Sequence, residues 1–273
     1  MSLDPIGYKP WSGKRTEHNR RPLVIADHIL NYKIRSIWLI GLMILGMVLV
    51  HVFPLMINSL VYHKELTATT MNSYMQSDLF FIFNIILVSL ICSDLFSDDL
   101  RSNSIILYLS RAMSTGNYFL GKWMGAMLVL CFFTLVPPLA ASIAIMATQA
   151  GPDYGSSLVV VLQTFLAGLW TALLLIPVGL AISAATSKRT YAGVATFMFF
   201  FVMFIVSSIL FSFSDDWLLL SPMYILFRSY DVIYGITMPS GTNVVILAGM
   251  IFILMVPPLW FVYDKIRRKG VGK

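Results

Sequence analysis

Long apolar stretches alternate with short polar ones along this chain, and six of the apolar stretches are long enough to cross a lipid bilayer. A membrane-spanning helix needs about 20 predominantly apolar residues to cross a hydrocarbon core roughly 30 Å thick. The six stretches are Ile37–Ile57, Asp78–Phe96, Tyr118–Thr148, Leu158–Thr186, Tyr191–Phe213 and Val244–Tyr263. They predict an all-α membrane protein with six transmembrane helices in a single domain, residues 1–273.

Prolines fall inside several of these stretches. The third contains Pro137 and Pro138, the fourth contains Pro177, and the sixth contains a second pair near its end, Pro257 and Pro258. Because proline has no backbone N–H and its ring clashes with the preceding turn, it kinks or breaks a helix. The third stretch is also longer than one crossing needs, so we expect it to kink at its prolines and to project beyond the bilayer.

Composition supports lipid as the surroundings of this chain. Of its 273 residues, 58% are hydrophobic and only 12% are charged. A soluble domain has roughly 45–50% apolar and about 25% charged residues. So large an apolar excess cannot be hidden in one soluble core, and it argues against a soluble globular protein.

The 19 Lys and Arg residues divide unevenly between the two sides of a six-helix arrangement. Only Lys64 and Arg228 fall on one side, which leaves 17 of the 19 on the other. Since basic residues concentrate in cytoplasmic loops, we expect the crowded side to be cytoplasmic. Both termini would share that side of the cell membrane. Placement beside apolar stretches also accounts for the formal net charge of +6 without a nucleic-acid partner.

Two segments outside the six stretches are also rich in apolar residues. In the N-terminal segment, residues 1–36, apolar and polar residues alternate at roughly helical spacing after Pro22. This predicts a cytoplasmic interfacial helix, with a plain extension of the first span as the alternative. The outer segment, residues 214–242, is too apolar for a simple loop. We expect re-entrant or surface-lying helices there, with Leu219 and Phe227 shielded from water.

Sequence motifs for catalysis or metal binding are missing from the chain. It contains neither H-E-x-x-H nor G-x-S-x-G. Of its four histidines only His51 lies inside an expected span, and its 16 methionines are scattered over several spans. We therefore expect no catalytic residue and no metal site. Cys92 and Cys131 fall in apolar stretches, where buried free thiols are the usual state.

Two amide side chains, Asn84 and Gln163, lie within expected spans. Hydrocarbon penalises an amide unless it forms hydrogen bonds. One interpretation is hydrogen bonding between helices, and the other is contact with a substrate along a transport pathway.

The connection between the second and third stretches, residues 97–117, has a composition that a plain loop does not need. Charged residues come first, an apolar run follows, and a second arginine closes it. The residues singled out are Asp98, Asp99, Arg101, Ile105, Ile106, Leu109 and Arg111. The pattern predicts a short amphipathic helix along the membrane face, which could dock into a groove of a partner, with Ile105, Ile106 and Leu109 inside the groove and Asp99 and Arg101 at its rim. A linker that only lies on lipid is the alternative.

The order of features in this region resembles that of the permease subunits of ATP-binding-cassette (ABC) exporters of the second class. An acidic and arginine-bearing turn is followed by a short amphipathic helix, a Ser-Arg step, and a Leu-Gly-Lys opening of a long span. The matching positions are Asp99, Arg101, Ser110, Arg111, Leu120, Gly121 and Lys122. The resemblance extends over the whole chain in the order of interfacial helix, spans and outer helices.

This resemblance implies a dimer of permeases that binds two separate ATPase subunits, with the segment from Asp98 to Ser110 as the coupling helix. The second and fifth spans would line the central cavity. The chain has no G-x-x-x-x-G-K-[ST] phosphate loop, so ATP and Mg²⁺ would bind to the partner and this chain would not be an enzyme by itself. An ATP-independent transporter or channel, and a membrane anchor for a partner complex, remain alternatives.

Overall fold

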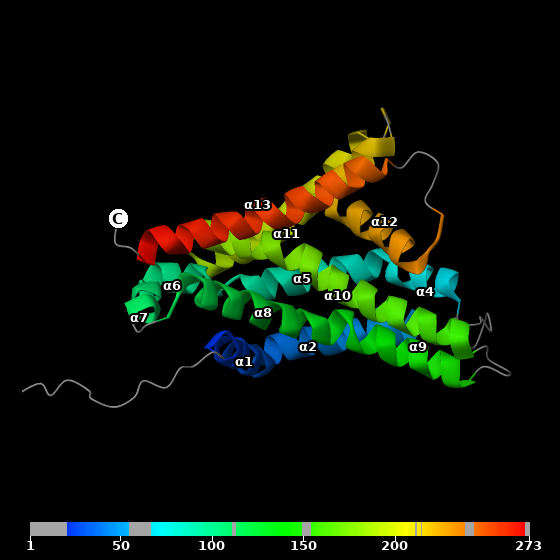
Figure 1. Ribbon diagram of the computed structural model, residues 1–273, viewed down its shortest axis with the longest axis horizontal. Coiled ribbons are helices and arrows are strands. Elements are labelled where there is room, and N and C mark those ends of the chain that lie inside the picture. Colours follow the sequence, from blue (N-terminus) through cyan, green and yellow to red (C-terminus); the bar gives the residue numbers. More distant parts are fainter. Residues whose placement is uncertain are drawn as a thin grey trace, which may run out of the picture.

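Helices account for all the regular structure in the part of the chain that the computed structural model describes (Figure 1). That part comprises residues 21–54, 67–110, 113–148, 154–210, 212–213, 215–237 and 243–270. The helices are α1 (Arg21–Ile34), α2 (Ile37–Gly46), the π-helical turn η1 (Met47–Val52), α4 (Ala68–Met75), α5 (Asp78–Cys92), α6 (Ser97–Ser102), α7 (Ser104–Ser110), α8 (Thr115–Thr134), α9 (Val136–Thr148), α10 (Tyr154–Ala185), α11 (Arg189–Leu210), the 3₁₀ helix η2 (Asp215–Leu220), α12 (Pro222–Tyr234) and α13 (Val244–Gly270).

Five helical segments in the described residues are long and apolar enough to cross a membrane. They are Asp78–Ser102, Thr115–Ala147, Gly155–Ala185, Arg189–Leu210 and Val244–Lys269. The pair formed by Arg21–Ile34 and Ile37–Val52 passes the same test together but bends by 78° at its break, so the number rises to six if that pair is one span. The all-helical fold is thus confirmed, and its helices are consistent with a membrane protein. The end of the first expected span, up to Ile57, lies outside the described residues.

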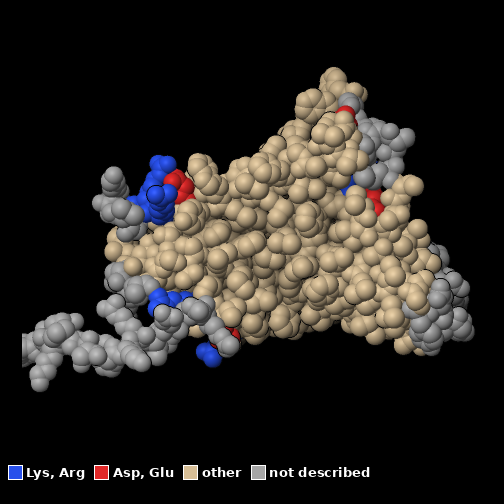
Figure 2. Space-filling view, viewed as in Figure 1, with Lys and Arg blue, Asp and Glu red and all other residues tan. Residues whose placement is uncertain are grey.

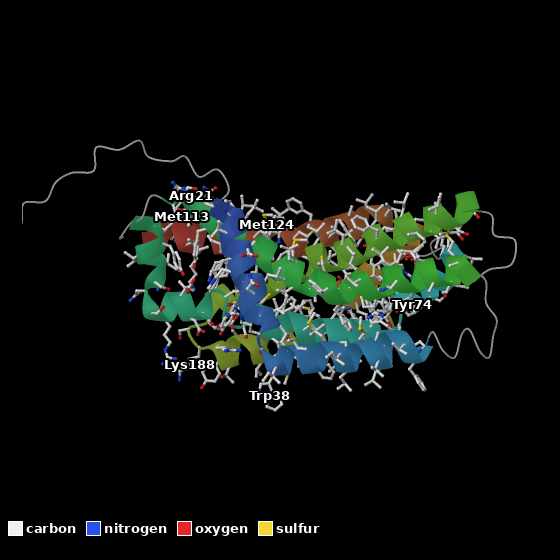
Figure 3. All side chains as sticks on the ribbon, turned by 90° about the horizontal axis from the view of Figure 1, so that it is seen from below. Arg21, Trp38, Tyr74, Met113, Met124 and Lys188 are labelled. Atoms are coloured by element: carbon white, nitrogen blue, oxygen red, sulfur yellow. The ribbon has the colours of Figure 1, made fainter. Side chains whose placement is uncertain are left out.

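Helix α1 lies across the bundle rather than along it. Figure 3 labels Arg21 at its start and Trp38 just beyond its end, on opposite sides of the molecule. Helix α1 packs on the face of α8 that contains Gly121 and Gly125. A Cβ atom on Gly121 would lie 2.7 Å from the Cβ atom of Ile25, and one on Gly125 would lie 2.9 Å from that of Ile29. The two glycines therefore let the backbones of α1 and α8 approach closely.

The predicted interruption of the third span is present at Leu135, where α8 ends and α9 begins. Neither Pro137 nor Pro138 has an N–H for the carbonyl four residues earlier, so the helical ladder is lost there. Helix α10 packs against this break at Gly168. A Cβ atom at that position would lie 2.5 Å from the carbonyl oxygen of Thr134. The prolines of α10 and α13, in contrast, lie inside continuous helices.

The five long segments differ in how much of their apolar surface the chain itself covers. In the most apolar stretch of the segment containing α5, 72% of the residues are buried, whereas the corresponding values are 17% for α11 and 11% for α13. Large side chains such as Phe201 and Trp260 remain exposed on these outer helices. A contiguous apolar surface of this kind is expected where lipid or another helix covers it.

The apolar segment before α13 forms the short helix η2 and the buried helix α12. Ser221 caps α12, its Oγ accepting a hydrogen bond from the N–H of Met223, and Gly235 ends it in the left-handed conformation with φ of 68°. Leu219 and Phe227 are only 3% and 9% exposed, so both are shielded, as expected. Helices α12 and α4 lie at the end of the molecule opposite α6 and α7 (Figure 1).

Candidate functional site

The predicted coupling segment folds as two short helices joined by one left-handed residue. Helix α6 ends at Asn103, whose φ of 55° and ψ of 19° turn the chain before α7 begins. Asparagine is one of the few residues other than glycine that adopts this conformation readily. We call residues 97–110 the α6–α7 elbow. Arg111, which the sequence also singles out, lies outside the described residues.

The apolar residues of the elbow do not share one outward face. Ile105 is 1% exposed and belongs to the core of the chain, and Leu109 is half-buried against the same core. Residues four apart lie on one side of a helix, so both point inward, while Ile106 points outward and is 52% exposed. The expectation that Ile105, Ile106 and Leu109 together enter a partner's groove therefore needs correction for Ile105 and Leu109. The outward surface includes the exposed side chains of Asp98, Arg101, Ile106 and Tyr108.

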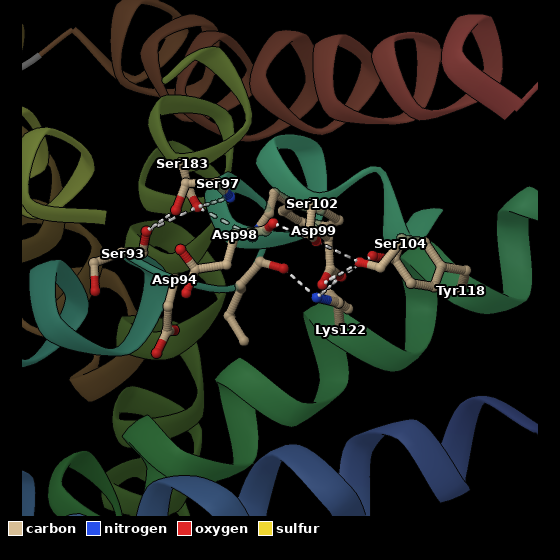
Figure 4. A network of polar contacts seen from close by, with 12 residues as sticks. Ser93, Asp94, Ser97, Asp98, Asp99, Ser102, Ser104, Tyr118, Lys122 and Ser183 are labelled. Atoms are coloured by element: carbon tan, nitrogen blue, oxygen red, sulfur yellow. Dashed lines mark hydrogen bonds and ion pairs between the residues drawn. The ribbon is translucent and has the colours of Figure 1, made fainter. Parts of the chain in front are cut away.

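Asp99 points inward and joins the elbow to α8. Its Oδ2 atom accepts hydrogen bonds from the ammonium of Lys122 and the hydroxyl of Tyr118, and its Oδ1 atom accepts one from Ser104 at 3.0 Å (Figure 4). Lys122 also donates to the carbonyl oxygen of Leu95. Asp99 is thus a positioning group for the elbow in this structure, rather than a charge at the rim of a partner interface.

A second ion pair lies where α5 ends. The ammonium of Lys33, at the end of α1, is 2.5 Å from Asp94 Oδ1 and donates to the carbonyl oxygen of Leu90 at 3.2 Å. Lys33 is 3% exposed and Asp94 is 7% exposed. Burial lowers the pKa of Lys33, and the adjacent Asp94 carboxylate opposes that effect by favouring the charged form. On the other side of the carboxylate, Arg189 Nη2 lies 3.7 Å from Asp94 Oδ2.

Two further contacts hold the start and the end of α6. The hydroxyl of Ser183, on α10, accepts hydrogen bonds from the backbone N–H groups of Phe96 and Ser97 at 3.2 and 3.3 Å, and thereby satisfies donors that a helix start leaves open. Lys269, on α13, donates to the carbonyl oxygen of Leu100 at 3.3 Å. Five helices, namely α1, α8, α10, α11 and α13, therefore contact the junction of α5 and α6 through polar groups.

Neither of the two amides proposed for a substrate pathway forms a hydrogen bond to another helix among the described residues. Asn84 is 0% exposed, and its Nδ2 atom donates to the carbonyl oxygen of Phe80 in its own helix at 2.7 Å. Its Oδ1 atom and the Oε1 atom of Gln163 have no hydrogen-bond partner among the described residues. A role in a pathway therefore remains a prediction for both.

Sequence reasoning missed several residues of this site, among them Lys33, Asp94, Ser183, Arg189 and Lys269. Lys33 falls on the same side of α1 as the buried residues Ala26 and Ile29. Its spacing of three to four residues from apolar positions could therefore have indicated that it is buried. A single serine in a long apolar helix gives no comparable signal. Among the described residues, no group of three or more His, Cys, Asp or Glu side chains could hold a metal ion.

Comparison of the chain with protein-family models and with curated proteins found no match. The resemblance to ABC permeases therefore rests on the residues of this chain alone.

Proposed function

We propose that this chain is the transmembrane permease subunit of an ATP-driven ABC exporter, working as a dimer with separate ATP-binding subunits. The observation that carries the proposal is the α6–α7 elbow. It presents an exposed surface of charged, aromatic and aliphatic side chains at one end of the molecule, while Asp99 fixes it to α8 and its backbone is hydrogen-bonded to side chains of α10 and α13. An element that only lay on lipid would not need these contacts.

The distribution of charge supports a membrane orientation with the elbow in the cytoplasm. On the face drawn in Figure 2, charged side chains gather at the two ends, and uncharged residues fill the length between them. The last turn of α13, at the same end as the elbow, contains Arg267, Arg268 and Lys269. Ile37 and Trp38 are 83% and 89% exposed at the bend after α1, where tryptophan would lie at the membrane interface. In this orientation six spans place both termini in the cytoplasm of the cell membrane.

The mechanism follows from the two sides of the elbow. A groove of the ATPase takes up Ile106 and Tyr108, and the charges of Asp98 and Arg101 orient the contact. ATP and Mg²⁺ bind to the ATPase, whose closure displaces the elbow. Because the elbow is joined to α5 by the turn at residues 93–96 and is hydrogen-bonded to α8, its displacement shifts the helices and exposes a central cavity alternately to the two sides of the membrane. Helix α12 then forms a re-entrant element of the outer leaflet.

Purification of the tagged chain from the membranes of its own host tests the proposal. We expect a protein with a phosphate loop and ATPase activity to co-purify in a mild detergent. Arg101→Glu and Ile106→Ala should weaken its association about tenfold to a hundredfold, whereas Lys64→Glu, on the expected outer side, should not. A chain that conducts ions or transports a solute alone in proteoliposomes, with no associated ATPase, would contradict the proposal.

A further inference from the structure

We infer that the cluster of Lys33, Asp94 and Arg189 is a mechanical joint that makes α1 and α11 move with the α6–α7 elbow. Lys33 and Arg189 are positioning residues in this inference, which rests on the proposed function for its direction of action. The joint itself is a property of the chain, and it can be tested without a partner.

The first argument is the energetic cost of the Lys33–Asp94 pair. Both side chains are removed from water, with exposed fractions of 4% and 6%. Two apolar residues of similar volume would often give at least equal stability at such a buried position. The ion pair instead fixes the position of one helix relative to the other. A buried ammonium can find a carboxylate and hydrogen-bond acceptors at few positions. Lys33 therefore fixes where the end of α1 lies relative to α5.

The second argument is the position of Asp94 at a break in the helix. Helix α5 ends at Cys92 and α6 begins at Ser97, with a turn between them. The last carbonyl groups of a helix have no partner within it, and Lys33 donates to one of them, that of Leu90, while it binds Asp94. Lys33 thus contacts both the final turn of α5 and the hinge that leads to the elbow.

The third argument is that the elbow and the hinge before it are each held by one of two packed helices, α8 and α1. Helix α1 is seated on α8 at Gly121 and Gly125, and α8 supplies Lys122 directly after the first of these glycines. Asp94 is held from α1 and Asp99 is held from α8 (Figure 4 shows both carboxylates). A displacement of the elbow therefore acts on the α1–α8 pair through both carboxylates.

Arg189 extends the joint to a fourth helix. It is the first residue of α11, and its guanidinium faces the Asp94 oxygen that Lys33 does not bind. The Arg189 side chain is 54% exposed, so this contact is weaker than the Lys33 pair. It nevertheless links the start of α11 to the same hinge, and α11 would shift together with α5.

Four variants separate this role from plain stability. Lys33→Met leaves the Asp94 carboxylate without its closest partner, and Asp94→Leu leaves the Lys33 ammonium without one. The combination Lys33→Met with Asp94→Leu removes the ionic link but leaves no unpaired charge in the pair. Lys33→Arg keeps the charge. We expect the double variant to fold as well as the parent. A loss of coupled motion between α1 and the elbow in this variant can then not be attributed to unfolding.

Hydrogen exchange of the chain alone in lipid nanodiscs tests the joint itself. Lys33→Met and the double variant should speed exchange of the amides from Ile29 to Ile34 by about tenfold, because the end of α1 is no longer fixed. Lys33→Arg should exchange like the parent. Equal protection of these amides in the parent and in the double variant would overturn the joint, whatever partner the chain has.

Distances between spin labels in the complex with its ATPase test the coupled motion. Labels at Tyr32 on α1 and Ser102 on α6 are each paired with one at Ile143 on α9, after replacement of both native cysteines. With ATP, Mg²⁺ and vanadate, both distances should change in the parent and in Lys33→Arg. In the double variant the distance from Ser102 should still change, while the distance from Tyr32 should change much less than in the parent, because only the Asp99–Lys122 link remains. If the Tyr32 distance changes there as much as in the parent, the inference is wrong. If the elbow never responds to nucleotide, the proposed function fails, and hydrogen exchange still decides the joint.

Discussion

The two ends of the molecule each carry a short helix, but they hold it with different chemistry. At one end two lysine–carboxylate pairs fix the α6–α7 elbow and the hinge before it, and the elbow keeps an exposed outward surface. At the other end α12 is buried and is fixed mainly by neutral groups. The hydroxyl of Tyr230 lies 2.6 Å from Thr171 Oγ1, and that of Tyr234 donates to Thr164 at 3.0 Å.

The carboxylate of α12 itself, that of Asp231, has partners that underline the contrast. Asp231 Oδ1 accepts hydrogen bonds from Asn72 at 2.8 Å and from Gln76 at 2.7 Å, and only Oδ2 has a charged partner, Arg228 at 3.2 Å. Burial raises the pKa of Tyr234 to about 12, which keeps this phenol a neutral donor. The comparison thus distinguishes a charged end, held by lysine–carboxylate pairs, from a neutral end, held mainly by hydrogen bonds from uncharged donors.

The largest effect should come from breaking an ion pair at the charged end. Asp99→Ala leaves the nearly buried ammonium of Lys122 without its carboxylate, so we expect the free energy of unfolding to fall by about 3 kcal/mol, toward the lower end of the range for buried pairs. Denaturant titration in mixed micelles measures it. Asp98→Ala is the matched control, because that neighbour is exposed. Equal stability of the two variants would show that Asp99 does not hold the elbow.

A somewhat smaller effect should come from filling the seat of α1. Gly121→Ala places a methyl group 2.7 Å from Ile25 Cβ and 2.9 Å from the carbonyl oxygen of Pro22, which should cost about 1–3 kcal/mol of unfolding free energy. Gly116→Ala is the control in the same helix, since nothing lies within 4 Å of the added atom. If both substitutions behave alike, α1 is not packed on this face of α8.

A smaller loss should come from the neutral end. Tyr234→Phe removes one hydrogen bond between α12 and α10, and we expect about 0.5–1.5 kcal/mol. Tyr224→Phe in the same helix is the control, because no hydrogen bond of its hydroxyl is present among the described residues. The comparison of the two ends would be wrong if Tyr234→Phe cost as much stability as Asp99→Ala.

The smallest effect on stability should come from the outward surface of the elbow. Arg101→Glu and Ile106→Ala alter exposed side chains, so each should change the free energy of unfolding by less than about 0.5 kcal/mol. The same denaturant titration measures this. A large loss of stability would mean that these residues serve the fold, and their use in partner association would then need another test.

Much of the fold can be predicted from the sequence, because long apolar runs and prolines act locally. Five expected spans correspond to long helices, and the break near Pro137 follows from the backbone hydrogen bonds that Pro137 and Pro138 cannot donate. The site is harder to predict, because its key pair joins residues 61 positions apart. Ile105 shows a second limit: in a seven-residue helix the sequence pattern does not determine which side faces inward. Asn103, which divides the elbow, resembles any other polar loop residue until its backbone angles are known.

The glycine seat of α1 also has a consequence for biosynthesis. Helix α1 leaves the ribosome well before the two glycines that receive it, because these belong to α8, which is made only after α2, α4, α5, α6 and α7. Asp94 precedes α8 and can already pair with Lys33, but until α8 is made the rest of α1 has no helix to pack on and can rest at the membrane surface as an amphipathic helix. Docking of α1 therefore comes late in assembly, and a nascent chain that stalls before α8 would expose this helix to the quality-control machinery of the cell.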